Sequence, residues 1–250
     1  LERLEELALE MNPKKPVSIG LRLNPNVSPE THPYITTGLK ENKFGLEESA
    51  VFEAVELLSK TKAPIRLRGL SLHIGSQLLE LDSLNDALEI TLAVQSKISQ
   101  KIGYTLDRFD AGGGVGIRYD SIDEKEECDV IHQYGRLLSK HLTKEISSGR
   151  IKELMIEPGR WLVARSGLLV TEVQYTKSTQ HKSFVIVDGG MNLLIRPALY
   201  SAEHRVAPLM ERAVEAPLAH ADIVGPICES ADFLARHRLL PEMKQGDRLA

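Results

Sequence analysis

Clusters of glycine and polar residues follow several short apolar runs of this 250-residue sequence, at points where reactive side chains could meet. One cluster reads His-Ile-Gly-Ser-Gln, a second contains three consecutive glycines, and a third reads Glu-Pro-Gly-Arg. Residue types able to bind a ligand or move a proton are common to all three. Their candidate residues are His73, Ser76, Gly112, Gly113, Gly114, Glu157, Gly159 and Arg160.

The glycine triplet has two interpretations. Glycines lack the Cβ atoms that would block a close approach, so residues 110–116 could present backbone N–H groups to an anion. The same glycines could simply form a tight turn after a strand. The segment has neither the Lys-Ser/Thr ending of a nucleotide-binding P-loop nor the GxGxxG spacing of a dinucleotide site. If it binds an anion, the phosphate of a cofactor fits best.

The other residues of these clusters are equally open to two interpretations. His73 could be a buried core histidine, or it could stack on a ring or move a proton. Ser76 could donate a hydrogen bond to phosphate. Glu157 could be a solvated or capping carboxylate, or it could hold a protonated ring nitrogen. Arg160 could bind a phosphate or carboxylate in a bidentate manner, or form a surface salt bridge.

Two further clusters lie later in the sequence. Arg196 and Tyr200 are four residues apart, downstream of an Asp-Gly-Gly run. Cys228 and Glu229 are adjacent within Gly-Pro-Ile-Cys-Glu. A cysteine is by default a small buried hydrophobe, but a thiol beside a carboxylate at a strand end could also be catalytic.

The elements that must position these residues follow an alternating pattern up to about residue 166. Short apolar runs alternate with longer stretches of helical periodicity, which predicts βα units on a parallel sheet. Because the carboxyl ends of parallel strands form one functional edge, the first clusters should meet there. The predicted strands are residues 17–23, 69–74, 106–110 and 154–157, and the predicted helices are residues 1–11, 47–58, 84–102 and 130–146.

After residue 165 the pattern changes to short alternating strands without long helices, which predicts a mainly antiparallel β domain. We expect a first domain over residues 1–166 and a second over residues 167–250. The predicted strands of the second domain are residues 168–175, 183–187 and 221–226, with a hairpin turn at 177–181. Residues 203–217 are a polar connection with no assigned element.

Composition excludes several classes of partner. The net charge is −4 and no basic stripe is interleaved with aromatic residues, so nucleic acid is not expected. Apolar runs are far shorter than the roughly 20 residues of a membrane-spanning helix. The two cysteines form neither a disulfide framework nor a CxxC metal pair, which fits a reducing compartment. A small-molecule ligand is therefore expected.

In this order, the clusters resemble the fold-type III pyridoxal-phosphate decarboxylases, whose barrel is alanine racemase-like. The similarity extends over nearly the whole chain. The matching segments are residues 23–27, 32–38, 43–45, 73–77, 110–116, 157–160, 188–200 and 225–232.

The resemblance implies a role for each candidate residue. His73 would stack on the pyridine ring of pyridoxal 5'-phosphate, and Glu157 would pair with the ring nitrogen. Ser76, Gly112, Gly113, Gly114 and Gly159 would bind the phosphate, with Arg160 between phosphate and substrate. Arg196, Tyr200 and Glu229 would bind the distal end of the substrate. Cys228 and His73 would be the catalytic residues, with Cys228 as the proton donor to the decarboxylated carbanion.

The family also implies an architecture and a reaction. The fold would be α/β, with part of a (β/α)8 TIM-type barrel followed by a β-barrel-like domain, in a homodimer with shared active sites. Cys-Glu in place of Cys-Asp favours the branch that converts meso-2,6-diaminopimelate to L-lysine and CO₂. Alternatives are decarboxylation of ornithine, arginine or carboxynorspermidine, or a non-catalytic homologue.

One family feature has no counterpart in this sequence. The family's Schiff-base lysine lies on an early barrel strand, and neither Lys43 nor Lys152 has a comparable position. We therefore expect the chain to be the middle of an enzyme, truncated at both ends. As it stands it would lack the lysine that attaches the cofactor. A cytoplasmic location is expected, or a plastid one in a plant.

Overall fold

The computed structural model describes residues 1–27, 43–119, 124–210 and 217–250, with backbone alone for residues 124–128. These residues form two compact units. The first unit comprises Leu1–Ile117 with Asp123–Ala164, and the second comprises Arg118–Ile122 with Arg165–Ala250. All residues from Arg165 onward belong to the second unit. The sequence led us to expect the boundary after residue 166. The family-like segment 32–38 lies outside the described residues, as does the side chain of Cys128.

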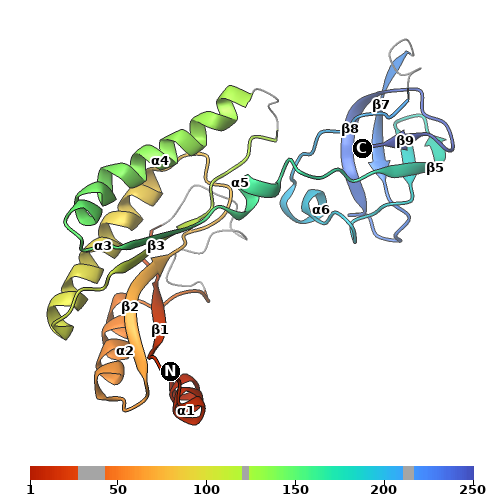
Figure 1. Cartoon of the computed structure of the whole chain (residues 1–250). Helices are drawn as coiled ribbons and strands as arrows, with labels where there is room; N and C mark the ends of the chain where they lie inside the picture. The colour runs from red at the N-terminus through yellow and green to blue at the C-terminus, as the bar shows by residue number, and fades with distance from the viewer. Residues whose placement is uncertain (28–42, 120–123, 211–216) are drawn as a thin grey trace. The chain divides into compact units, whose positions relative to one another are not determined.

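The first unit is built on a four-stranded parallel sheet in the order β1-β2-β3-β4 (Figure 1). Consecutive strands are neighbours, as expected of successive βα units. Its strands are β1 (Val17–Leu23), β2 (Ile65–Leu72), β3 (Arg108–Gly113) and β4 (Glu153–Glu157). Its helices are α1 (Glu2–Met11), α2 (Glu48–Lys60), α3 (Asp82–Ile102), α4 (Glu124–Ser147) and the short α5 (Gly159–Val163).

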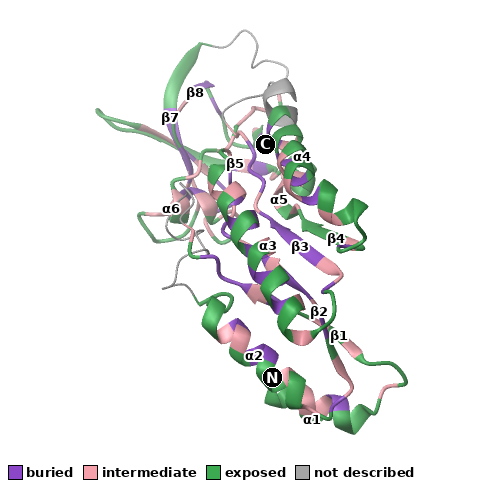
Figure 2. Ribbon diagram, turned by 90° about the vertical axis from the view of Figure 1, so that its left-hand side faces the viewer, coloured by how far each residue is buried: buried purple, intermediate pink, exposed green. Residues whose placement is uncertain are grey.

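Amphipathic helices cover this sheet with their apolar sides. Helix α3 buries a stripe that includes Leu84, Leu88 and Ile98, and it ends where Gly103 adopts a left-handed conformation. Figure 2 shows the buried side of α3 towards the sheet and its exposed side towards solvent. Tyr134 and Leu142 of α4 belong to one core cluster with Leu84 of α3 and Phe109 of β3. The helices therefore fix the sheet whose strand ends carry the polar clusters.

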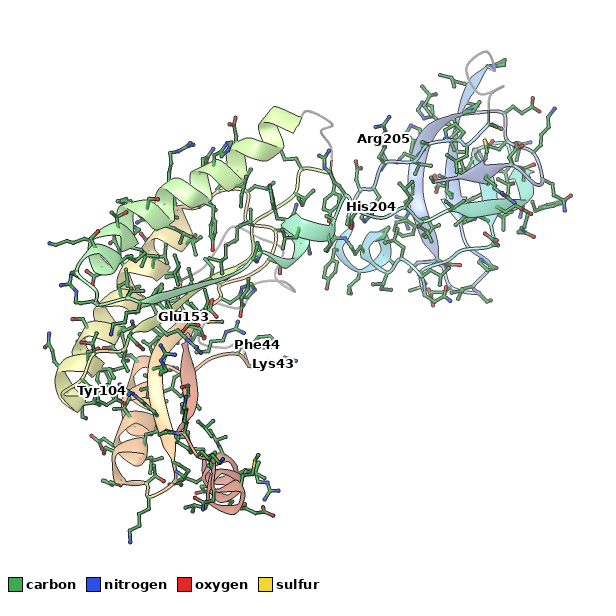
Figure 3. The ribbon with its side chains drawn as sticks, viewed as in Figure 1. Lys43, Phe44, Tyr104, Glu153, His204 and Arg205 are labelled. Atoms are coloured by element: carbon green, nitrogen blue, oxygen red, sulfur yellow. The ribbon has the colours of Figure 1, made fainter. Side chains whose placement is uncertain are left out.

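The amino-terminal edge of this sheet is held by ion pairs. Arg68 of β2 pairs with Asp107 at 2.9 Å and with Glu153 of β4 at 3.3 Å. Arg108 of β3 also pairs with Glu153, at 2.9 Å. Figure 3 labels Glu153 on this network. The Arg68 guanidinium lowers the pKa of Asp107 by hydrogen bonding to it. These contacts tie three strands together at the edge opposite the predicted site.

The two outer strands of the sheet, β1 and β4, have little hydrogen-bonded pairing along their outward edges. Apart from a parallel bridge between Leu23 and Leu46, the described residues provide no partner for the outer edges of β1 and β4. Leu154, Met155 and Ile156 of β4 are exposed apolar side chains. This half-barrel arrangement, followed by a mainly antiparallel unit, confirms the predicted fold class.

The second unit contains a five-stranded sheet in the order β8-β7-β6-β5-β9. Neighbours pair in antiparallel fashion except for β6 and β7, which are parallel. The core includes Val173, Val185 and Ile223. Its elements are β5 (Thr171–Ser178), β6 (Ser183–Val187), α6 (Arg196–Tyr200), β7 (Leu218–Val224), β8 (Phe233–Pro241) and β9 (Arg248–Leu249).

Some boundaries differ from the sequence predictions for physical reasons. Strand β3 runs on through Gly113, past the end predicted at residue 110, because a bulge between Asp110 and Gly113 lets Gly113 pair with Glu157 of β4. Strand β8 was not predicted, since charged residues and a bulge opposite Ala221 to Ile223 break its alternation. No helix in the described part of the chain is both long and apolar enough to cross a membrane.

Candidate functional site

The carboxyl ends of the four parallel strands bring the first candidate residues to one edge of the first unit. Glu157 is the last residue of β4, and the glycine triplet begins within β3. His73 directly follows β2. Gly113 and Glu157 are register partners across β3 and β4. The structure therefore brings His73 and Glu157 to the same edge, although they are 84 positions apart in the sequence.

Two carboxyl groups meet at this edge. Asp110 is 8% exposed, and its Oδ1 accepts a hydrogen bond from the backbone N–H of Gly112 at 2.9 Å. The carboxyl groups of Glu157 and Asp110 are close enough to share a hydrogen bond when one of them is protonated. Partial burial and the negative charge of Asp110 raise the pKa of Glu157, while the positive charge of Arg22 opposes this shift. The pair therefore favours a bound proton or a nearby cation.

Arg22 is a member of the cluster that the sequence analysis did not single out. It lies on β1, and its guanidinium donates a hydrogen bond to the backbone carbonyl of His73 at 3.0 Å. Burial lowers the pKa of Arg22, and the charge of Glu157 raises it. Its ring neighbour is Phe44, 5.2 Å from the guanidinium carbon, which follows Lys43 (Figure 3). Arg22 supplies the positive charge that faces the carboxyl pair.

His73 is held as a neutral imidazole. Burial lowers its pKa, and the charge of Arg22 lowers it further. The Nδ1 atom accepts a hydrogen bond from the backbone N–H of Gly113 at 3.3 Å. This contact assigns the proton of the neutral ring to Nε2. A neutral, oriented imidazole suits contact with a flat ring better than a buried cation would.

The glycine triplet has a packing role in addition to any ligand role. A Cβ on Gly112 would lie 2.1 Å from the carbonyl oxygen of Leu72, and one on Gly113 would lie 1.8 Å from that of Glu157. A Cβ on Gly114 would lie 2.1 Å from the carbonyl oxygen of Gly75. Glycine is therefore required because neighbouring strand ends approach within backbone contact.

The loops after β2 and β3 are joined by Gln77. Its side chain accepts from the N–H of Ile117 at 3.2 Å and donates to the carbonyl of the same residue. Arg160 donates to the Gln77 Oε1 at 2.9 Å. Gln77 thus connects the two loops to α5, where Gly159 and Arg160 lie. The Ser76 hydroxyl has no hydrogen-bond partner among the described residues.

In the second unit, Arg196 and Tyr200 occupy the two ends of α6. The Arg196 guanidinium carbon lies 5.8 Å from the ring centre of Tyr200 and 5.1 Å from that of Tyr119. Its Nε contacts the Nε2 of His204 at 3.3 Å. Figure 3 labels His204 and the adjacent Arg205 on the segment after α6. No carboxylate among the described residues pairs with Arg196.

Cys228 and Glu229 lie in an exposed loop of the second unit, between β7 and β8. The default expectation of a buried cysteine is therefore wrong for Cys228. A Glu229 carboxylate oxygen accepts from the N–H of Ala231 at 3.4 Å. The loop offers a thiol and a carboxylate on neighbouring residues.

Two described lysines of the first unit were candidates for the family's Schiff-base position. Lys152 directly precedes β4, at the opposite edge of the sheet. Lys43 is exposed and lies 5.1 Å from the Phe44 ring centre.

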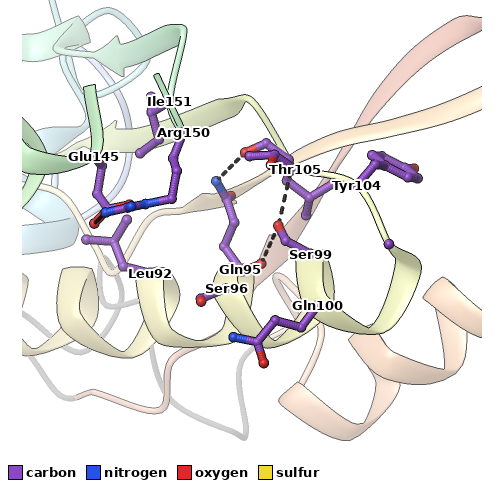
Figure 4. A pocket seen from close by; sticks show the side chains of 12 residues that line it. Leu92, Gln95, Ser96, Ser99, Gln100, Tyr104, Thr105, Glu145, Arg150 and Ile151 are labelled. Carbon is purple, nitrogen blue, oxygen red and sulfur yellow. Dashed lines mark hydrogen bonds and ion pairs between the residues drawn. The ribbon is translucent and has the colours of Figure 1, made fainter. Parts of the chain in front are cut away.

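A hollow of about 510 Å³ lies elsewhere in the first unit (Figure 4). Its lining includes Gln95, Ser99 and Tyr104 from α3 and the segment that follows it, and Glu145 and Arg150 from the end of α4 and after it. Leu106 and Ile151, which precede β3 and β4, also line it. It therefore lies at the amino-terminal edge of the sheet and contains none of the predicted site residues.

The comparisons with known proteins identify the family. The model described as pyridoxal-dependent decarboxylase, pyridoxal binding domain, matches residues 1–164. The chain belongs to this family, whose cofactor is pyridoxal phosphate.

The similar proteins narrow the position within the family. The chain is 44% identical over 250 residues to diaminopimelate decarboxylase from Pseudomonas aeruginosa, covering all of this chain and 56% of that protein. The crystal structure of diaminopimelate decarboxylase from Helicobacter pylori complexed with L-lysine has a TM-score of 0.85 and 35% identity, with 99% of this chain and 58% of that chain covered. Lysine/ornithine decarboxylase from Vibrio vulnificus, at 21% identity and a TM-score of 0.75, shares the fold. The chain thus spans somewhat more than half the length of these proteins.

Proposed function

We propose that the chain forms part of the active site of a pyridoxal-phosphate-dependent decarboxylase, a carboxy-lyase that converts meso-2,6-diaminopimelate to L-lysine and CO₂. The observation that carries this proposal is the convergence of His73, the glycine triplet and Glu157 at one sheet edge. The high similarity to diaminopimelate decarboxylases over the whole chain supports the choice of substrate.

The residues at the sheet edge fit the cofactor by their chemistry. The carboxyl pair of Asp110 and Glu157 favours a cationic N–H, which a protonated pyridine nitrogen offers. The neutral imidazole of His73 suits stacking on an aromatic ring. When bound, pyridoxal phosphate would withdraw the electron pair left on the substrate's α-carbon as CO₂ departs. Glu157 would stabilise the charged ring nitrogen that makes this possible.

The phosphate would be held by groups that have donors to offer. The Ser76 hydroxyl has no other partner among the described residues. Nothing lies within 4 Å of a Cβ placed on Gly159, so its backbone is open to a ligand. Gly112, Gly113 and Gly114 would contribute backbone N–H groups, and Arg160, held by Gln77, would lie near phosphate and substrate.

The residues of the second unit would act on the substrate. Arg196 would bind the distal carboxylate, because its described neighbours are aromatic rings and no carboxylate among the described residues pairs with it. Tyr200 would support the same end of the substrate, and Glu229 would bind its distal ammonium group. Cys228 would donate the proton that replaces the departing carboxyl group, and its exposure keeps the thiol available.

We also propose a homodimer in which Cys228 and Glu229 serve the active site of the neighbouring subunit. The exposure of their loop in the second unit supports this assignment. Because the proteins similar over the whole chain include bacterial decarboxylases, we place the enzyme in the cytoplasm.

Substrate selectivity provides the test. The protein, expressed from its complete gene and supplied with pyridoxal phosphate, should release CO₂ from meso-diaminopimelate with a kcat/KM at least about 100-fold above that for ornithine. Arg196→Gln should remove a charge-assisted contact of about 2–3 kcal/mol, so kcat/KM for meso-diaminopimelate should fall roughly 100-fold.

Arg205→Gln is the matched control, since Arg205 is exposed and is not one of the described residues that contact Arg196. This variant should behave as the parent protein. Faster turnover of ornithine than of meso-diaminopimelate, or an Arg196→Gln variant with unchanged kcat/KM, would overturn the proposed substrate.

A further inference from the structure

A buried carboxylate, Asp232, lies between two loops of the second unit. One loop, residues 225–231, connects β7 to β8 and carries Cys228 and Glu229. The other, residues 188–192, follows β6. The Asp232 side chain is 4% exposed, although residues 226–230 beside it are exposed. A charged group so deeply buried must be compensated by hydrogen bonds.

Each oxygen of this carboxylate accepts a hydrogen bond from a different loop. Oδ1 accepts from the backbone N–H of Met191 at 2.6 Å, and Oδ2 accepts from that of Ile227 at 2.7 Å. Ile227 directly precedes Cys228. The backbone of Asp232 adds two contacts, since its N–H donates to the carbonyl of Glu229 at 2.9 Å and its carbonyl accepts from Gly225 at 3.2 Å. Asp232 therefore binds the reactive loop at three points along its backbone.

Two glycines make room for this carboxylate. A Cβ on Gly190 would lie 2.7 Å from Oδ1, and a Cβ on Gly225 would lie 2.5 Å from Oδ2. The latter would also lie 2.5 Å from the Cα of Gly190. The two loops thus approach each other at a distance that only glycine permits, with the carboxylate packed against both.

A second buried acid of this unit lies on β7, and its charge is compensated in a different way. Asp222, also 4% exposed, forms an ion pair with Lys182 and accepts from the N–H of His237 at 2.8 Å. Asp232 has no cationic partner among the described residues. Its charge is matched by backbone N–H groups alone, which fix the course of the backbone rather than a side chain.

We propose that Asp232 is a positioning residue that sets the backbone conformation of residues 225–231 and thereby the location of the Cys228 thiol. The inference rests on the proposed function, which assigns Cys228 as the proton donor. Asp232 itself touches no reacting atom in this scheme. It acts through the N–H of Ile227, one residue before the thiol.

Asp232→Asn tests the proposal with little change in shape. The amide replaces one acceptor oxygen with an NH₂ group, which would face a backbone N–H with no acceptor. Cys228 alkylation by iodoacetamide, followed in the cofactor-free protein by peptide mass spectrometry, should change in rate at least about 3-fold. In the enzyme supplied with cofactor, kcat should fall at least about 10-fold with a much smaller change in KM. Asp247→Asn is the control, because Asp247 accepts from the N–H of Lys244 in a separate turn.

A double-mutant cycle with Cys228→Ala separates positioning from general damage. If Asp232 acts through the thiol, Asp232→Asn should lower kcat little further once the thiol is absent. Equal losses in both backgrounds, or an unchanged alkylation rate, would overturn the proposal. Full kcat in Cys228→Ala would instead refute the proton-donor role in the proposed function. If Asp232→Asn does not fold, Gly190→Ala, which presses on the same carboxylate, is measured in the same cycle.

Discussion

The two units hold their candidate residues by different means. In the first unit, His73, Asp110, Glu157 and Arg22 come from the ends of four neighbouring parallel strands and interact with one another. In the second unit, the Cys228 loop is attached through main-chain hydrogen bonds to Asp232. A parallel sheet brings strand ends together by its topology. A loop between antiparallel strands has no such convergence, so a dedicated carboxylate must hold it.

The largest effect should come from closing the narrowest backbone approach in the first unit. Gly113→Ala would place a Cβ 1.8 Å from the carbonyl oxygen of Glu157, so β3 and β4 must separate. The free energy of unfolding should fall by about 3 kcal/mol or more, measured by urea denaturation.

Gly135→Ala is the control for this change, because Gly135 lies on the exposed side of α4 with nothing within 4 Å of its Cβ position. Alanine favours helix there and should raise stability by up to about 1 kcal/mol. Equal losses in the two variants would show that strand approach at Gly113 is not the cause.

The corresponding change in the second unit should cost less. Gly190→Ala would press on the end of a side chain rather than on a backbone carbonyl, and stability should fall by about 2 kcal/mol. Gly167→Ala, with open space around its Cβ position, should change stability little. A loss at Gly190 as large as that at Gly113 would remove the distinction between the units.

A smaller effect is expected where α4 contacts the glycine triplet. Tyr134 is buried and donates to the carbonyl of Gly112 at 3.2 Å. Tyr134→Phe should cost about 1 kcal/mol in urea denaturation, because the buried carbonyl loses its donor. Tyr104 makes a similar contact with the carbonyl of Leu67 but is 38% exposed, so Tyr104→Phe should cost less. The reverse order would contradict the burial argument.

The most subtle change concerns proton binding in the first unit. Arg22 lowers the pKa of His73 by charge repulsion, so Arg22→Met should raise that pKa towards its ordinary value. An NMR titration of the histidine ring signals measures this shift. Arg66→Met, on the exposed side of β2 beside Tyr104, should leave the His73 pKa in place. An unmoved His73 pKa in Arg22→Met would show that the strand ends are not electrostatically coupled.

The alternating pattern of residues 1–166 was enough to predict the parallel sheet and the edge where its polar clusters meet. His73, the glycines and Glu157 each follow an apolar run. Because the strands are parallel, their carboxyl ends lie at one edge of the sheet. Arg22 could not be found this way, since it lies inside a strand and its role depends on charges from β3 and β4. The sequence holds one signal for it: an arginine in a mostly apolar strand, two residues before the polar Asn24 that follows the strand.

The second unit was less predictable because its contacts are not periodic. The role of Asp232 depends on Met191, 41 residues earlier, and on a backbone N–H that has no sequence signature. Helix α6 has only five residues, too few for a periodic pattern, and the Tyr119 and His204 that surround Arg196 come from separate segments. Their grouping is a property of the fold alone.

The packing of Gly190 and Gly225 against Asp232 has a consequence for how the sequence can vary over evolution. A larger residue at Gly190 would need a smaller or absent side chain at position 232, and one at Gly225 would in addition press on the Cα of Gly190. Losing the carboxylate would release the loop. Single substitutions at these three positions are therefore disfavoured, because none of them preserves the packing of the carboxylate against both loops. Across natural variants the three residues should change together or remain fixed, whereas exposed positions of the same loop, such as Ser230, should vary independently.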